Sequence, residues 1–439
     1  MTGALDGITV IDFSEYIAGP YCTMMLADMG ANVIKIERPQ GDAWRHTAPV
    51  APYEGRGYLA VNRGKRSVAL DLERAEARAV ARRLCERADV IVMNYRPGVA
   101  ERLGLGYGEL SALNPSVIFC ENTAFGREGP LANRGGFDIL SQAATGMILY
   151  ENKIDRGVPT YIATTAVADL TSGMMMAFAI VTALFHRASG GAGQRIETSL
   201  FASGLAAQYR PLLSVEELDR PVREGFLTEL HARRRQEDLR FEDVAKLRRQ
   251  YVAGRGRNNY YRVYETRDGL IAIACLNNGQ RRRLRDALGI DDATVEGLAY
   301  DWFSEEVRQA HHATTGIMEE ALLGRRTQEW IALLEPAGVP CAEVNLPEEL
   351  FEHPHVQENA LMLTLQHAVL GPIRQPASPI RMSETPPVAP APPPPLGAHG
   401  REVLREFGYD DAGIEQLIES GALVTRERLM ERDAETADG

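Results

Sequence analysis

The sequence predicts an α/β protein, with a Rossmann-like, doubly wound large domain and a smaller α+β domain. Short apolar runs alternate with helical segments over residues 8–120, which is the pattern of a parallel sheet with helices on its faces. From residue 256 onward a hairpin signal precedes a series of helical segments, which is typical of an α+β domain. At 439 residues the chain is long enough for two domains that each bury a core.

The N-terminal part opens with a strand, a helix and a second strand. Residues 8–13 (ITVIDF) form an apolar run that predicts a strand. A helix is expected at 20–29, because Pro20 suits a first helical turn and Gly30 suits a helix end. The pattern then continues with strands expected at 32–37, 67–70, 90–93 and 117–120, and an amphipathic helix at 73–87.

Composition divides the chain into four segments. Residues 215–250 are polar and helix-favouring without a strong apolar stripe, so they are interpreted as a linker or surface insertion. Two strand signals, 260–265 and 270–274, flank a turn and predict a β-hairpin, and the proline-dense run 386–395 predicts an extended connector. The expected layout is a large α/β domain at 1–200, a linker at 201–255, a small α+β domain at 256–345, and a return linker with the C-terminal part of the large domain at 346–439.

Charge and composition argue against several classes of partner. The formal net charge is −12, with 60 acidic and 48 basic residues, and a nucleic-acid-binding protein would need a dominant basic field. Five scattered cysteines without a CxxC pair indicate free thiols, and the first residues lack a signal-peptide pattern, so a cytoplasmic protein is expected. The most apolar segment, 170–185, is interpreted as a buried core helix too short to span a bilayer, so no membrane partner is expected.

One carboxylate stands out among the candidate catalytic residues. Residues 57–67 have glycines at the wrong spacing for a phosphate loop, no GxSxG serine motif occurs, and the histidines do not predict a metal site. Asp169 lies in the segment ADLTSGM (168–174), which leads into the most apolar helix, where the positive end of the helix dipole would act on it. Two interpretations are open: an N-cap aspartate, which is the common case before a helix, or a catalytic carboxylate.

Several long segments together resemble the class III CoA-transferase family, which includes formyl-CoA transferase and carnitine CoA-transferase. The resemblance runs nearly end to end, and only residues around 211–258 look unlike the usual pattern. It is carried by LDGITVIDF, AGPYCTMMLADMGANVIKIERPQGD, VNRGKRSVALDL, ADVIVMNYRPGVAERLGLGY, GREGPLANRGGFDILSQAATGM and ADLTSGMMMAFAIVTALFHRASGGAGQRIETSLF.

The resemblance implies a CoA-transferase with an aspartate nucleophile. In that family the aspartate of the Asp-x-x-x-Gly segment before the apolar helix is the nucleophile, which is Asp169 here. It further implies acyl-CoA and a small carboxylic acid as partners, no tightly bound cofactor, and an intertwined homodimer. Arginines would bind the CoA phosphates and an aromatic ring the adenine. The implied CoA pocket consists of Ala18, Arg38, Leu70, Asp71, Leu72, Asn94, Tyr95, Arg96, Arg102, Phe137 and Asp138.

Three departures from the family pattern bear on the substrate. Ile17 stands where formyl-CoA transferase has a glutamine, and the glycine-rich loop over its active site has at best a counterpart in Gly254 and Gly256. Both departures argue against oxalate as the acceptor. The alternative function is an acyl-CoA racemase or isomerase of the same superfamily, but Phe137 stands where the racemases have a proton-transferring histidine.

Overall fold

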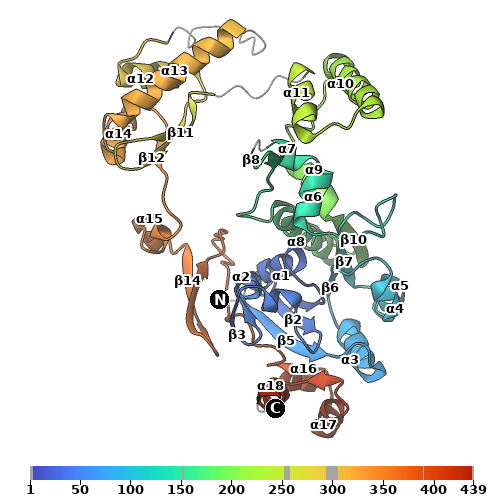
Figure 1. Cartoon of the computed structure of the whole chain (residues 1–439). Coiled ribbons are helices and arrows are strands. Elements are labelled where there is room, and N and C mark those ends of the chain that lie inside the picture. The colour runs from blue at the N-terminus through green and yellow to red at the C-terminus, as the bar shows by residue number, and fades with distance from the viewer. Residues whose placement is uncertain (1–2, 151–152, 252–257, 293–304, 389, 438–439) are drawn as a thin grey trace. The chain divides into compact units, whose positions relative to one another are not determined.

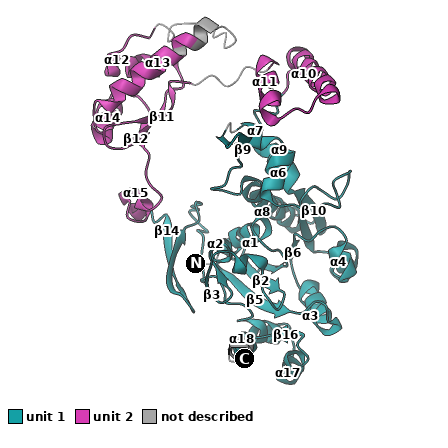
Figure 2. Ribbon diagram, in the orientation of Figure 1, with its two compact units in different colours: residues 1–213, 359–439 teal, residues 214–358 magenta. Residues whose placement is uncertain are grey.

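The chain forms two compact units (Figure 2). A computed structural model describes residues 3–150, 153–251, 258–292, 305–388 and 390–437. The first unit comprises residues 1–213 and 359–439, and the second comprises residues 214–358. The chain therefore leaves the first unit once and returns to it, so both termini belong to that unit (Figure 1). The expected linker at 201–255 is divided, with 201–213 in the first unit and the rest in the second.

A seven-stranded sheet forms the centre of the first unit. Its strand order is β10-β7-β6-β1-β2-β5-β16, and every neighbouring pair is parallel except β5 and β16. Chain order thus runs outward from β1 first to one side and then to the other, as in a doubly wound sheet. The predicted mostly parallel α/β sheet is confirmed. Its strands are β1 (Thr9–Asp12), β2 (Asn32–Glu37), β5 (Lys65–Leu70), β6 (Val90–Met93), β7 (Ile118–Thr123), β10 (Gln194–Ser199) and β16 (Leu423–Val424).

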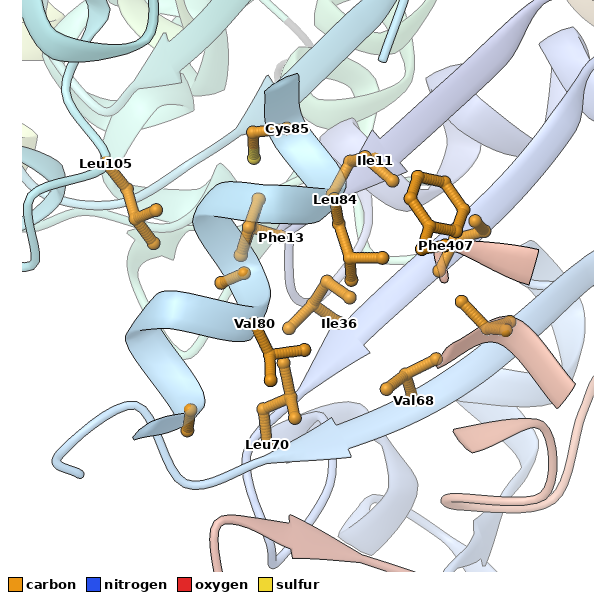
Figure 3. Packing of buried hydrophobic residues seen from close by; sticks show 14 of the residues in the cluster. Ile11, Phe13, Ile36, Val68, Leu70, Val80, Leu84, Cys85, Leu105 and Phe407 are labelled. Atoms are coloured by element: carbon orange, nitrogen blue, oxygen red, sulfur yellow. The ribbon is translucent and has the colours of Figure 1, made fainter. Parts of the chain in front are cut away.

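Alternate strand residues pack into two separate cores. Val10 lies in the core that includes residues of α1 and α8, whereas its neighbour Ile11 lies in the core that includes residues of α3. Figure 3 shows the second core, where Ile11 and Leu70 of the sheet meet Leu84 of α3 and Phe407 from the C-terminal part. A sheet covered on both faces needs apolar residues on both, which explains the continuous apolar runs. The helices named here are α1 (Ala18–Asp28), α3 (Ala75–Glu86) and α8 (Val167–Ala188).

Helix α8 packs one face against α1. A side chain at Gly173 would come within 2.7 Å of the Ala18 carbonyl oxygen, so glycine permits the close approach of the two helices. The opposite face is exposed in this chain, with Phe178 70% and Phe185 73% accessible. The predicted buried core helix is therefore wrong for that face. The segment 170–185 was also predicted to be too short to span a bilayer, and this is wrong. Helix α8 has 22 residues, and among the described residues it is the one helix long and apolar enough to cross a membrane.

Charged groups are buried beneath the sheet's carboxyl edge. Arg45 is inaccessible to solvent, and its guanidinium binds both carboxylate oxygens of Glu37, at 2.7 and 2.9 Å. Burial opposes ionisation of Glu37, but Arg45 lowers the pKa of that carboxyl to about 2. Arg45 also donates to the Pro394 carbonyl at 3.0 Å and stacks over the Tyr58 ring. The N-terminal sheet is thereby joined to the proline-dense run.

The C-terminal return completes the first unit. Strands β14 (Met362–His367) and β15 (Gly371–Pro376) form a hairpin, and α16 (Gly400–Glu406) and α17 (Asp411–Glu419) follow. Within the expected connector 386–395, the described residues form neither helix nor strand. The Gly64 N–H donates to the Ala391 carbonyl at 2.8 Å, so the connector is held by backbone hydrogen bonds.

The second unit contains a three-stranded antiparallel sheet and helices. Strands β11 (Tyr261–Glu265) and β12 (Leu270–Ala274) pair across the turn 266–269, which confirms the predicted hairpin. The polar segment before it, which was interpreted as a linker or surface insertion, forms two helices. The other described elements are α10 (Glu216–Gln236), α11 (Phe241–Tyr251), α12 (Asn278–Leu288), α13 (Glu305–Leu323), α14 (Thr327–Leu334), β13 (Cys341–Glu343), the 3-10 helix η3 (Glu349–Phe351) and α15 (Pro354–Glu358).

Candidate active site

A cavity of about 880 Å³ lies at the carboxyl ends of β1, β6 and β7. Strands β1 and β6 are neighbours from which the chain winds in opposite directions, and ligands of doubly wound sheets bind at this kind of switch point. The segments that directly follow these strands line the cavity: Glu15, Tyr16 and Ile17 after β1, Asn94, Tyr95 and Arg96 after β6, and Asn122, Thr123 and Ala124 at the end of β7.

Asp169 lines this cavity from the first turn of α8. It is the third helical residue, and Ala166 occupies the N-cap, so the N-cap interpretation of Asp169 is wrong. Its carboxylate accepts a hydrogen bond from the backbone N–H of Ala18, the first residue of α1. Burial, and then the nearby Asp138 carboxylate, raise the pKa of Asp169 to about 7, although the Ala18 hydrogen bond acts in the opposite direction. Asp169 is therefore a desolvated carboxylate at the positive end of a helix.

Asp138 caps the helix that carries Asp169. It is the first residue of α6 (Asp138–Ala144), and its Oδ1 accepts from the backbone N–H of Ala168 at 2.8 Å and of Asp169 at 3.4 Å. Its Oδ2 accepts from the Gln142 side chain at 2.5 Å. Aspartate is a common N-cap residue, but here Asp138, from another helix, caps α8 in place of Asp169. Two carboxylates consequently lie side by side at the start of α8.

The loop after β1 is held in a strained conformation. Tyr16 has a φ of 67°, in the left-handed region that a tyrosine rarely adopts. The Asn94 side chain fixes the preceding residue, accepting from the Glu15 N–H at 2.9 Å and donating to the Glu15 carbonyl at 2.7 Å. The Tyr16 ring meets Phe137 edge to face, with centroids 5.2 Å apart. This strained loop leads directly to Ala18 and so to the Asp169 carboxylate.

A second cavity of about 480 Å³ adjoins the first. Both are lined by Glu15, Tyr95 and Val99, so the two cavities share a wall. Arg38 lines the second cavity, donates through Nε to the Gly41 carbonyl at 2.9 Å, and lies 3.5 Å from Glu15 Oε1. The Arg38 side chain is half exposed, so a ligand phosphate has access to it.

The predicted pocket residues line one or the other of the two cavities, except for two residues that line neither. Ala18 and Arg102 line neither cavity, although the Ala18 N–H reaches Asp169. Gly254 and Gly256 fall outside the described residues. Asn94, Tyr95, Arg96, Phe137, Asp138 and Asp169 line the first cavity, and Arg38, Leu70, Asp71, Leu72 and Tyr95 line the second.

Several residues of the site were not predicted. Glu15 and Tyr16 follow a predicted strand directly, so the rule that ligands bind at carboxyl strand ends would have identified them. Trp44 and Arg134 carry no such signal, because Trp44 lies in the 3-10 helix Ala43–His46 and Arg134 in an irregular segment, and neither directly follows a strand of the central sheet. Gln142 follows Asp138 by one helical turn, but nothing in the sequence indicates that the two side chains bond.

The chain is similar to known proteins over most of its length. The model of CoA-transferase family III matches residues 5–400. The chain is 33% identical to the succinate–glutarate CoA-transferase of Agrobacterium fabrum, over 92% of this chain and 95% of that relative. It is 31% identical to the succinyl-CoA:mesaconate CoA-transferase of Haloarcula hispanica, over 92% of this chain and 97% of that relative.

A solved structure shows the same likeness. The crystal structure of a CAIB/BAIF family protein from Brucella suis is 27% identical, covers 93% of this chain and 100% of that chain, and has a TM-score of 0.71. The quoted motifs, the doubly wound sheet and the match over most of the sequence agree, and the chain belongs to CoA-transferase family III.

Proposed function

We propose that this protein transfers coenzyme A from an acyl-CoA thioester to an acceptor carboxylic acid, with Asp169 as the nucleophile. The observation that carries the proposal is the position of Asp169, whose carboxylate lines the switch-point cavity and is held by the Ala18 N–H. A carboxylate is a weak nucleophile in water, and desolvation of the kind that raises the pKa of Asp169 makes it more reactive.

The proposed reaction has four steps. An Asp169 oxygen attacks the thioester carbonyl, the C–S bond breaks, and the CoA thiolate leaves a mixed anhydride on the enzyme. The thiolate then attacks the aspartyl carbonyl, which releases the donor acid and leaves an aspartyl-CoA thioester. The acceptor carboxylate attacks this thioester, expels the thiolate and forms a second anhydride. Attack of the thiolate on the acceptor's acyl carbon yields the new acyl-CoA and free Asp169.

The surrounding backbone suits the charge that develops in each attack. The Ala18 N–H belongs to the first turn of α1, where the helix dipole favours negative charge. Such groups stabilise an oxyanion on a tetrahedral carbon. We assign the acyl and thioester end of the substrate to the first cavity, and the nucleotide end, with its phosphates, to the second cavity near Arg38.

For the acids, we propose short dicarboxylates. The relatives reported above are named for succinate and glutarate, and for succinyl-CoA and mesaconate, and each of these acids carries two carboxylate groups. Arg96 and Arg134 line the cavity that holds Asp169, and either guanidinium would suit the distal carboxylate. The test is transfer from succinyl-CoA to glutarate, mesaconate and matched monocarboxylates, followed by mass spectrometry of the thioesters. Product formation that needs no second acid would instead support the racemase alternative.

We expect Arg38→Ala to raise the KM for acyl-CoA with little change in kcat, because Arg38 lines the second cavity. Loss of a charge-assisted hydrogen bond costs about 1.5–3 kcal/mol, which corresponds to roughly a ten- to hundredfold weakening. Steady-state kinetics with varied acyl-CoA concentration measures the change in KM. Arg82→Ala, on the exposed side of α3, is the control and should leave KM unchanged. An unchanged KM in Arg38→Ala would remove this arginine from the proposed CoA site.

We also propose a homodimer, with the exposed face of α8 in its interface. Met174, Phe178, Val181 and Phe185 recur at helical spacing and are all exposed in the single chain. Contiguous apolar surface of this kind marks an interface. Light scattering at micromolar concentration should give the mass of a dimer, and Phe178→Glu with Phe185→Glu should lower it to that of the monomer. A wild-type monomer under these conditions would contradict the proposal.

A further inference from the structure

Gln142 connects two walls of the cavity around Asp169. Its side chain is completely buried, and its Nε2 donates to Asp138 Oδ2 at 2.5 Å and to the Ile162 carbonyl at 3.2 Å. Its Oε1 accepts from the Ile162 N–H at 2.9 Å. Both polar atoms of the amide are therefore used. Ile162 belongs to the segment Tyr161–Thr164, which lines the same cavity.

The contacts of Gln142 continue to the nucleophile helix. Asp138 Oδ2 is held by Gln142, while Asp138 Oδ1 accepts from the first N–H groups of α8 at Ala168 and Asp169. The two oxygens of a carboxylate are joined rigidly through one carbon, so a hydrogen bond that fixes one oxygen also fixes the orientation of the other. The rotamer of Asp138 therefore determines how the start of α8 is capped, and Gln142 determines that rotamer.

We propose that Gln142 is a positioning residue for CoA transfer, which sets the Asp169 carboxylate through Asp138 and sets the cavity segment 161–164 through Ile162. The inference rests on the proposed function, because it concerns the nucleophile of that reaction. Gln142 does not touch the reacting atoms in this arrangement. Its effect reaches Asp169 by geometry, through the cap, and by charge, through the distance between the two carboxylates.

Replacement of Gln142 should change catalysis in a way that loss of packing does not. Gln142→Leu removes the donor to Asp138, so this carboxylate can turn from the start of α8 toward other partners. Asp138 is the second cause of the raised pKa of Asp169, after burial. As the Asp138 charge moves away, Asp169 should ionise at lower pH, and the acid limb of the kcat/KM profile should shift downward. We expect kcat to fall about ten- to a hundredfold, as for loss of a hydrogen bond to a charged group.

Gln208 offers a matched control in the same unit. It is also a buried glutamine, and its Nε2 donates to the Thr145 carbonyl at 3.2 Å and the Gly204 carbonyl at 3.0 Å. Both of these bonds go to the backbone, and Gln208 lines neither described cavity. Gln208→Leu should therefore lower stability like Gln142→Leu, and leave the pH midpoint of kcat/KM where the wild type has it.

The test compares full-length wild type, Gln142→Leu, Gln142→Asn and Gln208→Leu by pH profiles of CoA transfer and by thermal unfolding. The asparagine variant keeps an amide on a shorter side chain, so it provides a folded test if the leucine variant does not fold. In an Asp138→Asn background the Gln142 substitution should shift the midpoint no further, as a double-mutant cycle requires.

Two results would overturn the inference. One is a midpoint that neither Gln142 variant moves, and the other is a Gln208→Leu variant that shifts it equally. Failure of the proposed function is a different outcome, since the wild type itself would then show no exchange of acids on CoA.

Discussion

Asp169→Asn should lose CoA-transfer turnover by several orders of magnitude, on the order of a thousandfold or more, while the protein still folds. Asparagine has the size of aspartate, and its side-chain oxygen can accept the Ala18 N–H as the carboxylate does. Asparagine cannot form an anhydride, because its neutral amide lacks the carboxylate oxygen that attacks the thioester. Steady-state assays with succinyl-CoA and glutarate measure the loss. Asp155→Asn, an exposed aspartate in the same region, is the control and should retain wild-type turnover.

The same substitution should stabilise the protein at alkaline pH. The folded-state pKa of Asp169 is about 7, above its ordinary value of 3.8, so the folded protein holds this proton more tightly than the unfolded chain. The favourable contribution is complete below about pH 4 and is lost as pH rises through about 7. At pH 8, Asp169→Asn should raise the free energy of unfolding by on the order of 2–4 kcal/mol. The gain should shrink toward pH 5, and urea denaturation at both values tests it.

These two effects separate a catalytic carboxylate from a structural one. A structural aspartate that caps its helix would keep both its stability and the protein's activity on substitution, because asparagine caps a helix about as well as aspartate. Reduced stability of Asp169→Asn at pH 8, together with retained transfer, would contradict both the site and the environment described for this residue.

Arg45→Met should destabilise the folded protein by about 3–5 kcal/mol, the largest effect expected of a single substitution outside the site. The guanidinium binds both oxygens of Glu37, lies 3.5 Å from Glu54, and donates to the carbonyls of Tyr53 and Pro394. Methionine would fill the space but leave two buried carboxylates without their main cation. Urea denaturation at pH 7 measures the change.

Arg56→Met is the matched control for Arg45. Arg56 is exposed and lies in the same stretch of chain, so its replacement should change the free energy of unfolding by about 0.5 kcal/mol at most. A second change, Glu37→Met, should recover part of the loss caused by Arg45→Met, because one carboxylate no longer lacks a partner. A loss under about 1 kcal/mol for Arg45→Met would show that the buried cluster is not held by this arginine.

The strands of the sheet could be predicted because their apolar periodicity is local. Residues 32–37 and 90–93 were predicted as strands and form β2 and β6 at those positions. The charged residues inside the strands of this sheet could not be interpreted in the same way. Lys35 and Lys65 are fully buried, and their partners Asp42 and Asp12 become neighbours only when the sheet assembles. Burial of a charge depends on partners distant in sequence, which periodicity does not show.

The candidate site was predicted through resemblance more than through pattern. Pattern alone favoured an N-cap for Asp169, whereas in the structure Asp138 caps α8 from another helix and Asp169 faces the cavity. The exposed face of α8 was missed for a related reason: apolar composition indicates burial, but it does not indicate whether the chain itself covers both faces of a helix. Both errors concern contacts between separate elements.

The central claim is that Asp169 carries the acyl group, and trapping with hydroxylamine tests it most directly. Anhydrides and thioesters of a carboxyl group react with hydroxylamine to give a hydroxamate, so wild type treated during turnover should acquire this modification. Asp169 is the only carboxylate side chain in the tryptic peptide 157–187, so a mass change on that peptide identifies the residue without ambiguity. The account predicts the modified peptide only when acyl-CoA is present and never in Asp169→Asn. Rapid turnover with an unmodified 157–187 peptide, or a hydroxamate on another carboxylate, would contradict it.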